Sequence, residues 1–141
     1  MSDYRTLTGH GNPAPTIPRP EITPLPAVLT VRDGLPVIYG AGTEPTCGIR
    51  VVHPTNPKSR SKNHSIAMLY VPPHGKLDLH NHEAEETYCI LSGTGVLMSR
   101  EGRQNIGPGH FIYLAPWSEH GIENTGTEVL VALLATSPPN P

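Results

Sequence analysis

Three residues within a short stretch carry side chains that bind metal ions. His80 and His82 are separated by one residue, so in a β-strand both imidazoles point to the same side and two nitrogen atoms converge. After a short turn, Glu86 returns a carboxylate oxygen toward this pair. Metals of borderline softness accept imidazole and carboxylate ligands together. The spacing therefore predicts a metal site where two strands meet.

Tyr88 is the candidate catalytic residue beside this site. It lies two positions after Glu86, so strand alternation places both side chains on the inner face. The Tyr88 hydroxyl can donate to a substrate oxygen or act as an acid or base, and the alternative is that it only bonds to the backbone.

Among the other histidines, one is a candidate metal ligand and the rest are not. His120 is distant in sequence, but it opens a predicted strand after a turn and can reach the same interior. The remaining histidines have no partner at ligand spacing and are interpreted as surface or structural residues. They are His10, His53, His64, His74 and His110.

Short strands must position these side chains. The sequence has 17 Pro and 14 Gly against one Phe and one Trp, which is typical of many short elements broken by turns. Runs that read as strands alternate with turn residues from residue 65 onward, which favours an antiparallel barrel or sandwich. The predicted strands are 65–71, 76–82, 86–91, 95–100, 111–114, 121–124 and 128–135.

The chain before residue 65 is less regular. Residues 1–36 are predicted to form a Pro-rich N-terminal arm with a first strand, either poorly ordered or swapped onto a neighbouring subunit, and residues 37–141 a single domain. Runs at 28–31 and 37–39 flank the turn pair Asp33-Gly34, which predicts a hairpin. Residues 53–63 read as a solvated basic loop, with attraction of an anionic substrate as the lesser alternative.

The residues around the histidine pair resemble the first motif of the cupins. That motif is a glycine, H-x-H, three or four residues, a glutamate, six residues and a glycine. Gly75, His80, His82, Glu86 and Gly93 follow it, with one fewer residue than usual between Gly75 and His80.

The second cupin motif is similar to a later segment. Gly102 and Pro108 stand at its start, and His120 and Asn124 keep its H-x3-N spacing, so the resemblance covers about residues 64–135. The chain departs from the motif at Ala115, where proline is usual, at Trp117, where glycine is usual, and at His110, where aspartate is frequent. The Trp117 indole is expected either to pack or to wall the pocket.

The resemblance implies an all-β fold, the double-stranded β-helix or cupin jelly-roll barrel. It also implies that His80, His82, Glu86 and His120 hold one divalent transition metal. The donor set suits Fe, Mn, Ni, Zn, Co or Cu and does not choose among them. Four protein ligands leave up to two positions open on a six-coordinate ion, which favours catalysis over a structural role.

The expected function is that of a metal-dependent enzyme acting on a small carbonyl, enol or aromatic substrate, with a cupin dioxygenase as the first hypothesis. The alternative is a non-redox lyase, isomerase, decarboxylase or polyketide cyclase in which the metal is a Lewis acid. A small-ligand binding protein is the second alternative. The cavity is expected to be mostly apolar, lined by Ile90, Ile112 or Phe111, Ile122 and Leu133.

Composition limits the classes of partner and the cellular location that we expect. A formal charge of −2 indicates neither a basic surface for binding nucleic acid nor a polybasic membrane anchor. The first residues contain no apolar stretch, and Cys47 and Cys89 form no C-x-x-C pair, so we expect a cytoplasmic protein with reduced thiols. Both faces of the predicted strand 128–135 are apolar, so both need to be covered. This predicts a homodimer unless N-terminal strands cover the outer face.

Overall fold

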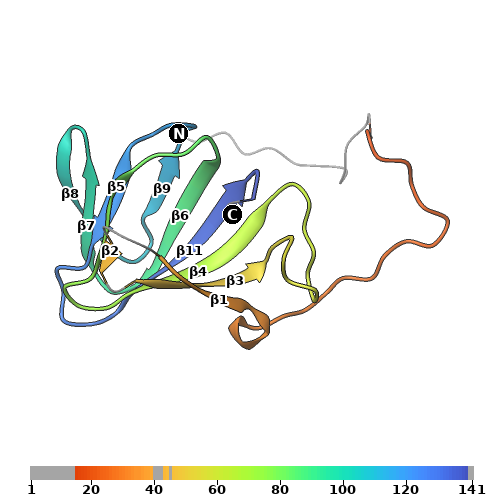
Figure 1. Cartoon of the computed structure of the whole chain (residues 1–141), viewed down its shortest axis with the longest axis horizontal. Helices are drawn as coiled ribbons and strands as arrows, with labels where there is room; N and C mark the ends of the chain where they lie inside the picture. Colours follow the sequence, from red (N-terminus) through yellow and green to blue (C-terminus); the bar gives the residue numbers. More distant parts are fainter. Residues whose placement is uncertain (1–14, 40–42, 45, 140–141) are drawn as a thin grey trace, which may run out of the picture.

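Two antiparallel β-sheets build the described part of the chain. The structure, a computed structural model, describes residues 15–39, 43–44 and 46–139. Figure 1 shows the strands of the two sheets curving around a common interior. Within these residues the only helix is the one-turn η1, Val31–Asp33, so the fold is all-β, as predicted.

The larger sheet has six strands in the spatial order β1-β3-β4-β11-β6-β9. Its central strands are long, and β11 pairs with both β4 and β6. The bounds are β1 Leu35–Ile38, β3 Cys47–Val52, β4 Ser65–Val71, β6 Glu85–Ser92, β9 Phe111–Leu114 and β11 Leu130–Ser137.

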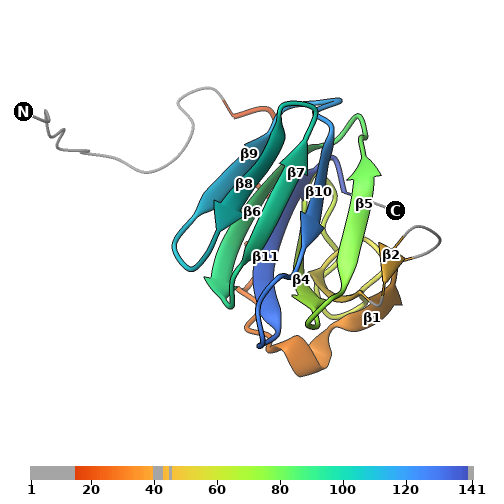
Figure 2. The ribbon, with the colours of Figure 1, turned by 90° about the vertical axis from the view of Figure 1, so that its left-hand side faces the viewer.

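The smaller sheet has five strands in the order β2-β5-β10-β7-β8, and Figure 2 shows it in front of the larger sheet. Strands from distant parts of the sequence alternate between the two sheets, which is the jelly-roll arrangement. The bounds are β2 Thr43–Glu44, β5 Lys76–His80, β7 Gly95–Ser99, β8 Gly102–Ile106 and β10 His120–Glu123.

The core lies between the sheets and follows the alternation of the strands. Along β11, every second residue from Leu130 is buried and the residues between them are half-buried. This strand therefore buries one face in the core and leaves the other on the outside of the barrel. The core cluster includes Leu69, Val71, Ile90, Ile122, Leu130 and Ala132.

Most predicted strands are confirmed to within two residues, but the hairpin around Asp33-Gly34 is wrong. Thr30 caps a 3-10 turn at this point. Its side chain accepts a hydrogen bond from the backbone N–H of Arg32, and the Asp33 carboxylate accepts one from the backbone N–H of Thr30. The following strand β1 then pairs with β3. Strands β2, β3 and β8 were not predicted.

The Pro-rich arm lies partly outside the described residues, as does His10. Residues 15–30 contain no helix or strand, and nearly all their side chains are exposed. The division of the chain at residue 36 stays a prediction. No helix in the described ranges is long and apolar enough to cross a membrane.

Candidate metal centre

Three histidines meet at one end of the five-stranded sheet. His80 ends β5, His120 opens β10, and the two are direct cross-strand partners in the pairing of these strands. His82 follows two residues after His80. One ligand atom from each of the three lies within 4.8 Å of the others, as the sequence predicts for a shared site.

Hydrogen bonds to the backbone orient all three imidazoles. A carbonyl oxygen can only accept, so each Nδ1 must donate its proton, which leaves Nε2 as the unprotonated ligand atom. This is the usual way in which proteins fix a metal-binding histidine. The Nδ1 bonds run from His80 to the carbonyl of Asp78 at 2.7 Å, from His82 to Ala84 at 2.8 Å and from His120 to Ser118 at 2.8 Å.

Two of the Nε2 atoms that face the centre make no hydrogen bond within the described part of the chain. Those of His82 and His120 are buried, and neither has a hydrogen-bond partner among the described residues. A buried polar atom without a partner is costly, and a bound cation removes that cost. The pKa of the His80 imidazole is lowered, chiefly because the ring is partly withdrawn from water although the residue as a whole is exposed, and further by the other two imidazoles. This favours its neutral, ligating form.

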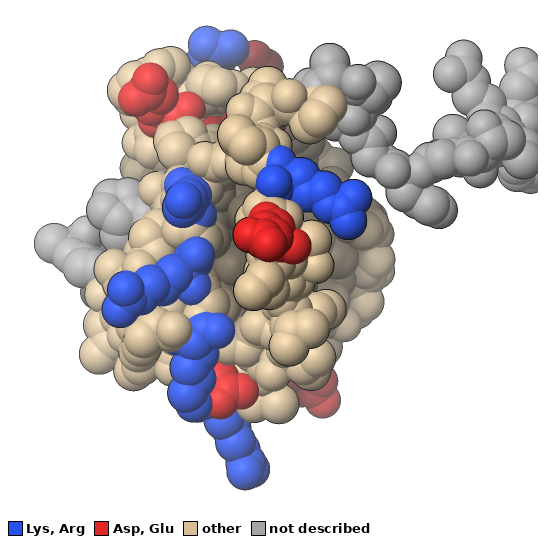
Figure 3. Space-filling model, turned by 90° about the vertical axis from the view of Figure 1, so that its right-hand side faces the viewer, with Lys and Arg blue, Asp and Glu red and all other residues tan. Residues whose placement is uncertain are grey.

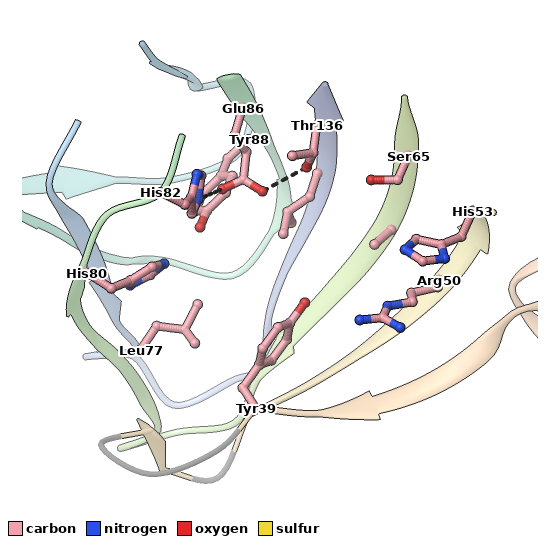
Figure 4. A pocket seen from close by; sticks show the side chains of 12 residues that line it. Tyr39, Arg50, His53, Ser65, Leu77, His80, His82, Glu86, Tyr88 and Thr136 are labelled. Atoms are coloured by element: carbon pink, nitrogen blue, oxygen red, sulfur yellow. Dashed lines mark hydrogen bonds and ion pairs between the residues drawn. The ribbon is translucent and has the colours of Figure 1, made fainter. Parts of the chain in front are cut away.

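Glu86, near the start of β6, brings a carboxylate next to His82 and His120. Its Oε1 lies 3.3 Å from Nε2 of His82 and 3.6 Å from Nε2 of His120. Both distances exceed the roughly 2.7–2.9 Å of a charge-assisted hydrogen bond. The three donor atoms therefore surround a common point and are not hydrogen-bonded to one another. The other oxygen, Oε2, accepts a hydrogen bond of 2.9 Å from the Thr136 hydroxyl, as Figure 4 shows.

The environment keeps Glu86 ionised despite its burial. Burial alone would raise the pKa of this carboxyl, but the contact with His120, the hydrogen bond from the Thr136 hydroxyl and the nearby His82 ring outweigh it and hold the pKa below its ordinary value. An ionised carboxylate beside three imidazoles is the donor set that a divalent transition metal takes.

Tyr88 is fully buried against this cluster. Its ring stands edge-on to the ring of His120, with the centroids 5.7 Å apart. Burial raises the pKa of the Tyr88 hydroxyl well above its usual value, and the negative charge of Glu86 and a hydrogen bond to it raise it further. The hydroxyl is therefore protonated at neutral pH and donates to Glu86.

A cavity of about 280 Å³ opens beside the cluster. This volume lies near the lower end of the range for small-molecule sites. His80, His82, Glu86 and Tyr88 line it, and His80 is exposed, so the centre is reachable from outside. His120 is buried behind the other ligands.

The cavity is mostly apolar, as the sequence predicts, but one of its walls is polar. Its far wall carries Tyr39, Arg50, His53 and Ser65, none of which was predicted as a site residue. His53 is buried here and is not a surface residue, and its Nδ1 accepts a hydrogen bond from the backbone of Thr55. The sequence offers one signal, that the H-x-H pair needs an opposite wall. This wall comes from β3, from the start of β4 and from the residues that directly follow β1 and β3.

The expected apolar lining is partly wrong. Ile90, Ile112 and Ile122 are buried in the core and do not line this cavity, Phe111 is 73% exposed, and Leu133 lies on the outer side of β11. The apolar residues that do line the cavity are Ala67, Leu77 and Leu134.

The residues that depart from the cupin motif do not line the cavity. Trp117 is 63% exposed and does not line the cavity. Its φ of 68° is a left-handed conformation that explains why glycine is usual at this position. His110 replaces aspartate as the acceptor of its turn, because its Nδ1 receives a hydrogen bond of 2.9 Å from the backbone of Gly107. His74 lies in a turn at a φ of 69°.

Comparison with known proteins agrees with this geometry. The profile of the cupin domain matches residues 67–136. The uncharacterised protein MJ1618 of Methanocaldococcus jannaschii is 37% identical over 76 residues, which cover 53% of this chain and 61% of that protein. The chain thus spans less than two thirds of that relative.

Solved structures resemble the whole barrel at low identity. The polyketide cyclase RemF from Streptomyces resistomycificus is 17% identical, with a TM-score of 0.71 over 80% of each chain. A predicted oxalate decarboxylase from Thermotoga maritima is 24% identical, with a TM-score of 0.67 over 78% of this chain and 97% of its own. With the cupin profile on the segment that carries the histidines, and the jelly-roll fold around them, the chain belongs to the cupin superfamily.

Proposed function

We propose that this protein is a metalloenzyme that binds a small carbonyl, enol or aromatic substrate on a divalent metal held by His80, His82, His120 and Glu86. The observation that carries the proposal is the orientation of the imidazoles. Each Nδ1 is bonded to a backbone carbonyl, and the buried Nε2 atoms of His82 and His120 face the centre without a partner.

The roles of the residues follow from their surroundings. A divalent metal in this donor set supplies Lewis acidity and, if it is redox-active, electron transfer. The Thr136 hydroxyl holds Oε2 of Glu86, so that Oε1 stays turned toward His82 and His120. Tyr88 keeps its proton at neutral pH and is the group that can deliver it to a substrate oxygen.

Two reactions use the same centre. The dioxygenase predicted from the sequence requires a redox-active metal and oxygen. The non-redox alternative requires only Lewis acidity and a proton donor, and the protonated hydroxyl of Tyr88 supplies that donor. The named activities of similar folds, a polyketide cyclase and a predicted oxalate decarboxylase, lend the dioxygenase no support and agree with the alternative. A ligand-binding protein without turnover is the remaining candidate.

The metal site is tested by its stoichiometry. We expect about one bound metal per chain, and we expect His80→Ala to weaken metal affinity by more than about 100-fold, because even the loss of a residue that only supports a ligand costs 10–100-fold. His64→Ala removes an exposed histidine outside the cluster and is the matched control. Elemental analysis and calorimetric titration give both numbers, and equal affinity of the two variants would exclude the site.

The reaction class is tested by oxygen consumption. Protein purified without added metal is analysed for its native ion, and candidate carbonyl and enol compounds are then supplied with an oxygen electrode in place. A zinc-loaded protein that changes substrate without consuming oxygen would exclude the dioxygenase. A loaded protein that binds these compounds and changes none of them would favour the binding protein.

A further inference from the structure

A cation faces the candidate metal centre across the cavity. Arg50 lies on β3, which pairs with β4 so that Arg50 is opposite Ala67, another residue of the cavity wall. Figure 4 shows Arg50 and His53 on one side of the space and His80, His82 and Glu86 on the other. The cavity therefore has a basic end and a metal-binding end.

The Arg50 guanidinium has no carboxylate partner of its own. None of the ion pairs within residues 15–39, 43–44 and 46–139 involves it. Glu86 is the only acidic residue among the described lining residues, and it is held at the opposite end by Thr136 and the histidines. A half-buried cation without a counter-charge is ready to bind an anion.

Neutral hydroxyl groups accompany this cation. Ser65 and Tyr39 line the same wall, and Gly48 makes room for Tyr39, since a Cβ at Gly48 would lie 3.0 Å from the tyrosine hydroxyl oxygen. Burial raises the pKa of the Tyr39 hydroxyl, so it stays protonated as a donor. A guanidinium with nearby hydroxyl donors matches the oxygens of a carboxylate.

The loop beside this wall is basic. It leaves the cavity wall at His53 and returns at Ser65, and it contains Lys58, Arg60 and Lys62 but no acidic residue. Lys58 pairs with Asp33 at 2.7 Å. Figure 3 shows several Lys and Arg side chains on one face of the molecule, with Asp or Glu side chains between them. A positive surface around a concave site raises the rate at which anions arrive.

We infer that the substrate is a small oxo or enol acid whose carboxylate binds Arg50 while its carbonyl or enol oxygen is directed at the histidine cluster. This inference rests on the proposed function and deepens it. One guanidinium matches the single charge and the two oxygens of a carboxylate, whereas a phosphate dianion buried beside one cation would keep an uncompensated charge. The cavity of about 280 Å³ suits a small acid.

The test compares a charged ligand with its neutral counterpart. Acetoacetate and methyl acetoacetate are titrated into zinc-loaded protein by calorimetry. We expect acetoacetate to bind at least about tenfold more tightly to the native protein, and we expect Arg50→Gln to remove most of this preference, since a charge-assisted hydrogen bond accounts for a factor of this size. Arg50→Lys, which keeps the charge and loses the planar fork, should fall between the two.

A matched control removes the same charge outside the cavity. Arg60→Gln lies on the basic loop, is exposed, and should keep the preference. Unchanged acetoacetate binding by both Arg50 variants, with the circular dichroism spectrum of the native protein, would overturn the inference. Equal losses in Arg50→Gln and Arg60→Gln would also overturn it, because the effect would then be general charge and not a site.

Separate measurements test the metal site and the anion site. Zinc affinity is measured for every variant and should be unchanged by Arg50→Gln. In metal-free protein, the NMR signal of the Arg50 Nε–H group should shift on addition of acetoacetate, so a protein that binds no zinc still tests Arg50. A larger shift with inorganic phosphate than with acetoacetate would overturn the carboxylate in favour of a phosphorylated ligand.

Discussion

The centre depends first on how single residues hold the ligands. Each imidazole is fixed by one hydrogen bond to the backbone, whereas Glu86 is fixed by side chains. Supporting partners of this kind orient a ligand and tune its basicity. Substitution of a supporting side chain therefore tests the centre without removing a ligand.

Thr136→Val removes the buried hydroxyl that donates to Glu86 and keeps the shape of the side chain. We expect metal affinity to fall by about 10–100-fold and stability to fall by about 1–3 kcal/mol, because a buried carboxylate oxygen loses its donor. Thr87→Val is the control, since Thr87 lies on the outer face of β6. Metal titration and urea unfolding measure the two effects, and identical results for both variants would contradict this role.

Trp117→Gly is expected to stabilise the protein. The residue sits at a φ of 68°, where a side chain costs about 1–2 kcal/mol, while the added glycine costs about 0.5–1 kcal/mol in chain entropy. The net gain is about 0.5–1 kcal/mol, measured by urea unfolding. Trp117→Ala removes the same indole but keeps Cβ, so it should give no gain, and an equal gain in both variants would show that backbone strain is not the cause.

At the scale of elements, the pairing of β5 with β10 brings the distant histidines together. His80 and His120 are cross-strand partners, so the register of these two strands sets the spacing of the ligands. Asn124 lies just after β10 and is buried. Its side chain donates to the carbonyls of Val71 and Glu128 and accepts from the backbone of Gly126. The motif asparagine thus connects the ends of three strands and binds no metal.

Asn124→Ala should destabilise the barrel. Removal of three hydrogen bonds, one buried and two partly buried, with two carbonyls losing their donor, is expected to cost about 2–4 kcal/mol. Urea unfolding measures the loss, and Asn105→Ala, on the exposed strand β8, should stay within about 0.5 kcal/mol of the native protein. A loss for Asn124→Ala as small as that of the control would show that these bonds do not hold the strands.

At the scale of the whole molecule, the outer face of the six-stranded sheet is apolar. Strands β1 and β3 extend this sheet at its edge, and Leu91, Phe111 and Tyr113 remain exposed on the outer face at the other edge. Exposed apolar clusters of this kind mark association surfaces. The homodimer predicted from the sequence stays a prediction, and this face is where we place it.

A double substitution tests the dimer. We expect sedimentation of the native protein at micromolar concentration to give a dimer, and Leu91→Lys with Phe111→Lys to give a monomer, because two charges would be buried in the interface. Leu79→Lys on the other sheet is the control, since Leu79 and Leu91 are both 48% exposed. A native monomer would exclude the dimer, and an undisturbed dimer in the double variant would exclude this face.

The sequence by itself determined the local half of the site. The one-residue spacing and a short turn suffice to bring His80, His82 and Glu86 together, although β5 ends at His80 and His82 lies just beyond it. Alternation along β6 places Tyr88 beside Glu86. Strands with a clear apolar pattern, such as β4 and β9, were predicted at their observed bounds. The reason is that side-chain direction within a strand repeats every two residues and needs no knowledge of its neighbours.

Only the tertiary structure decided the other half. The polar edge strand β8 has no apolar alternation to reveal it, and Gly48 and Arg50 interrupt the apolar residues of β3. The placement of Arg50 and His53 opposite the histidines depends on which strands pair and in which register. Such pairings are set by contacts between residues far apart in the chain, and a local pattern carries no record of them.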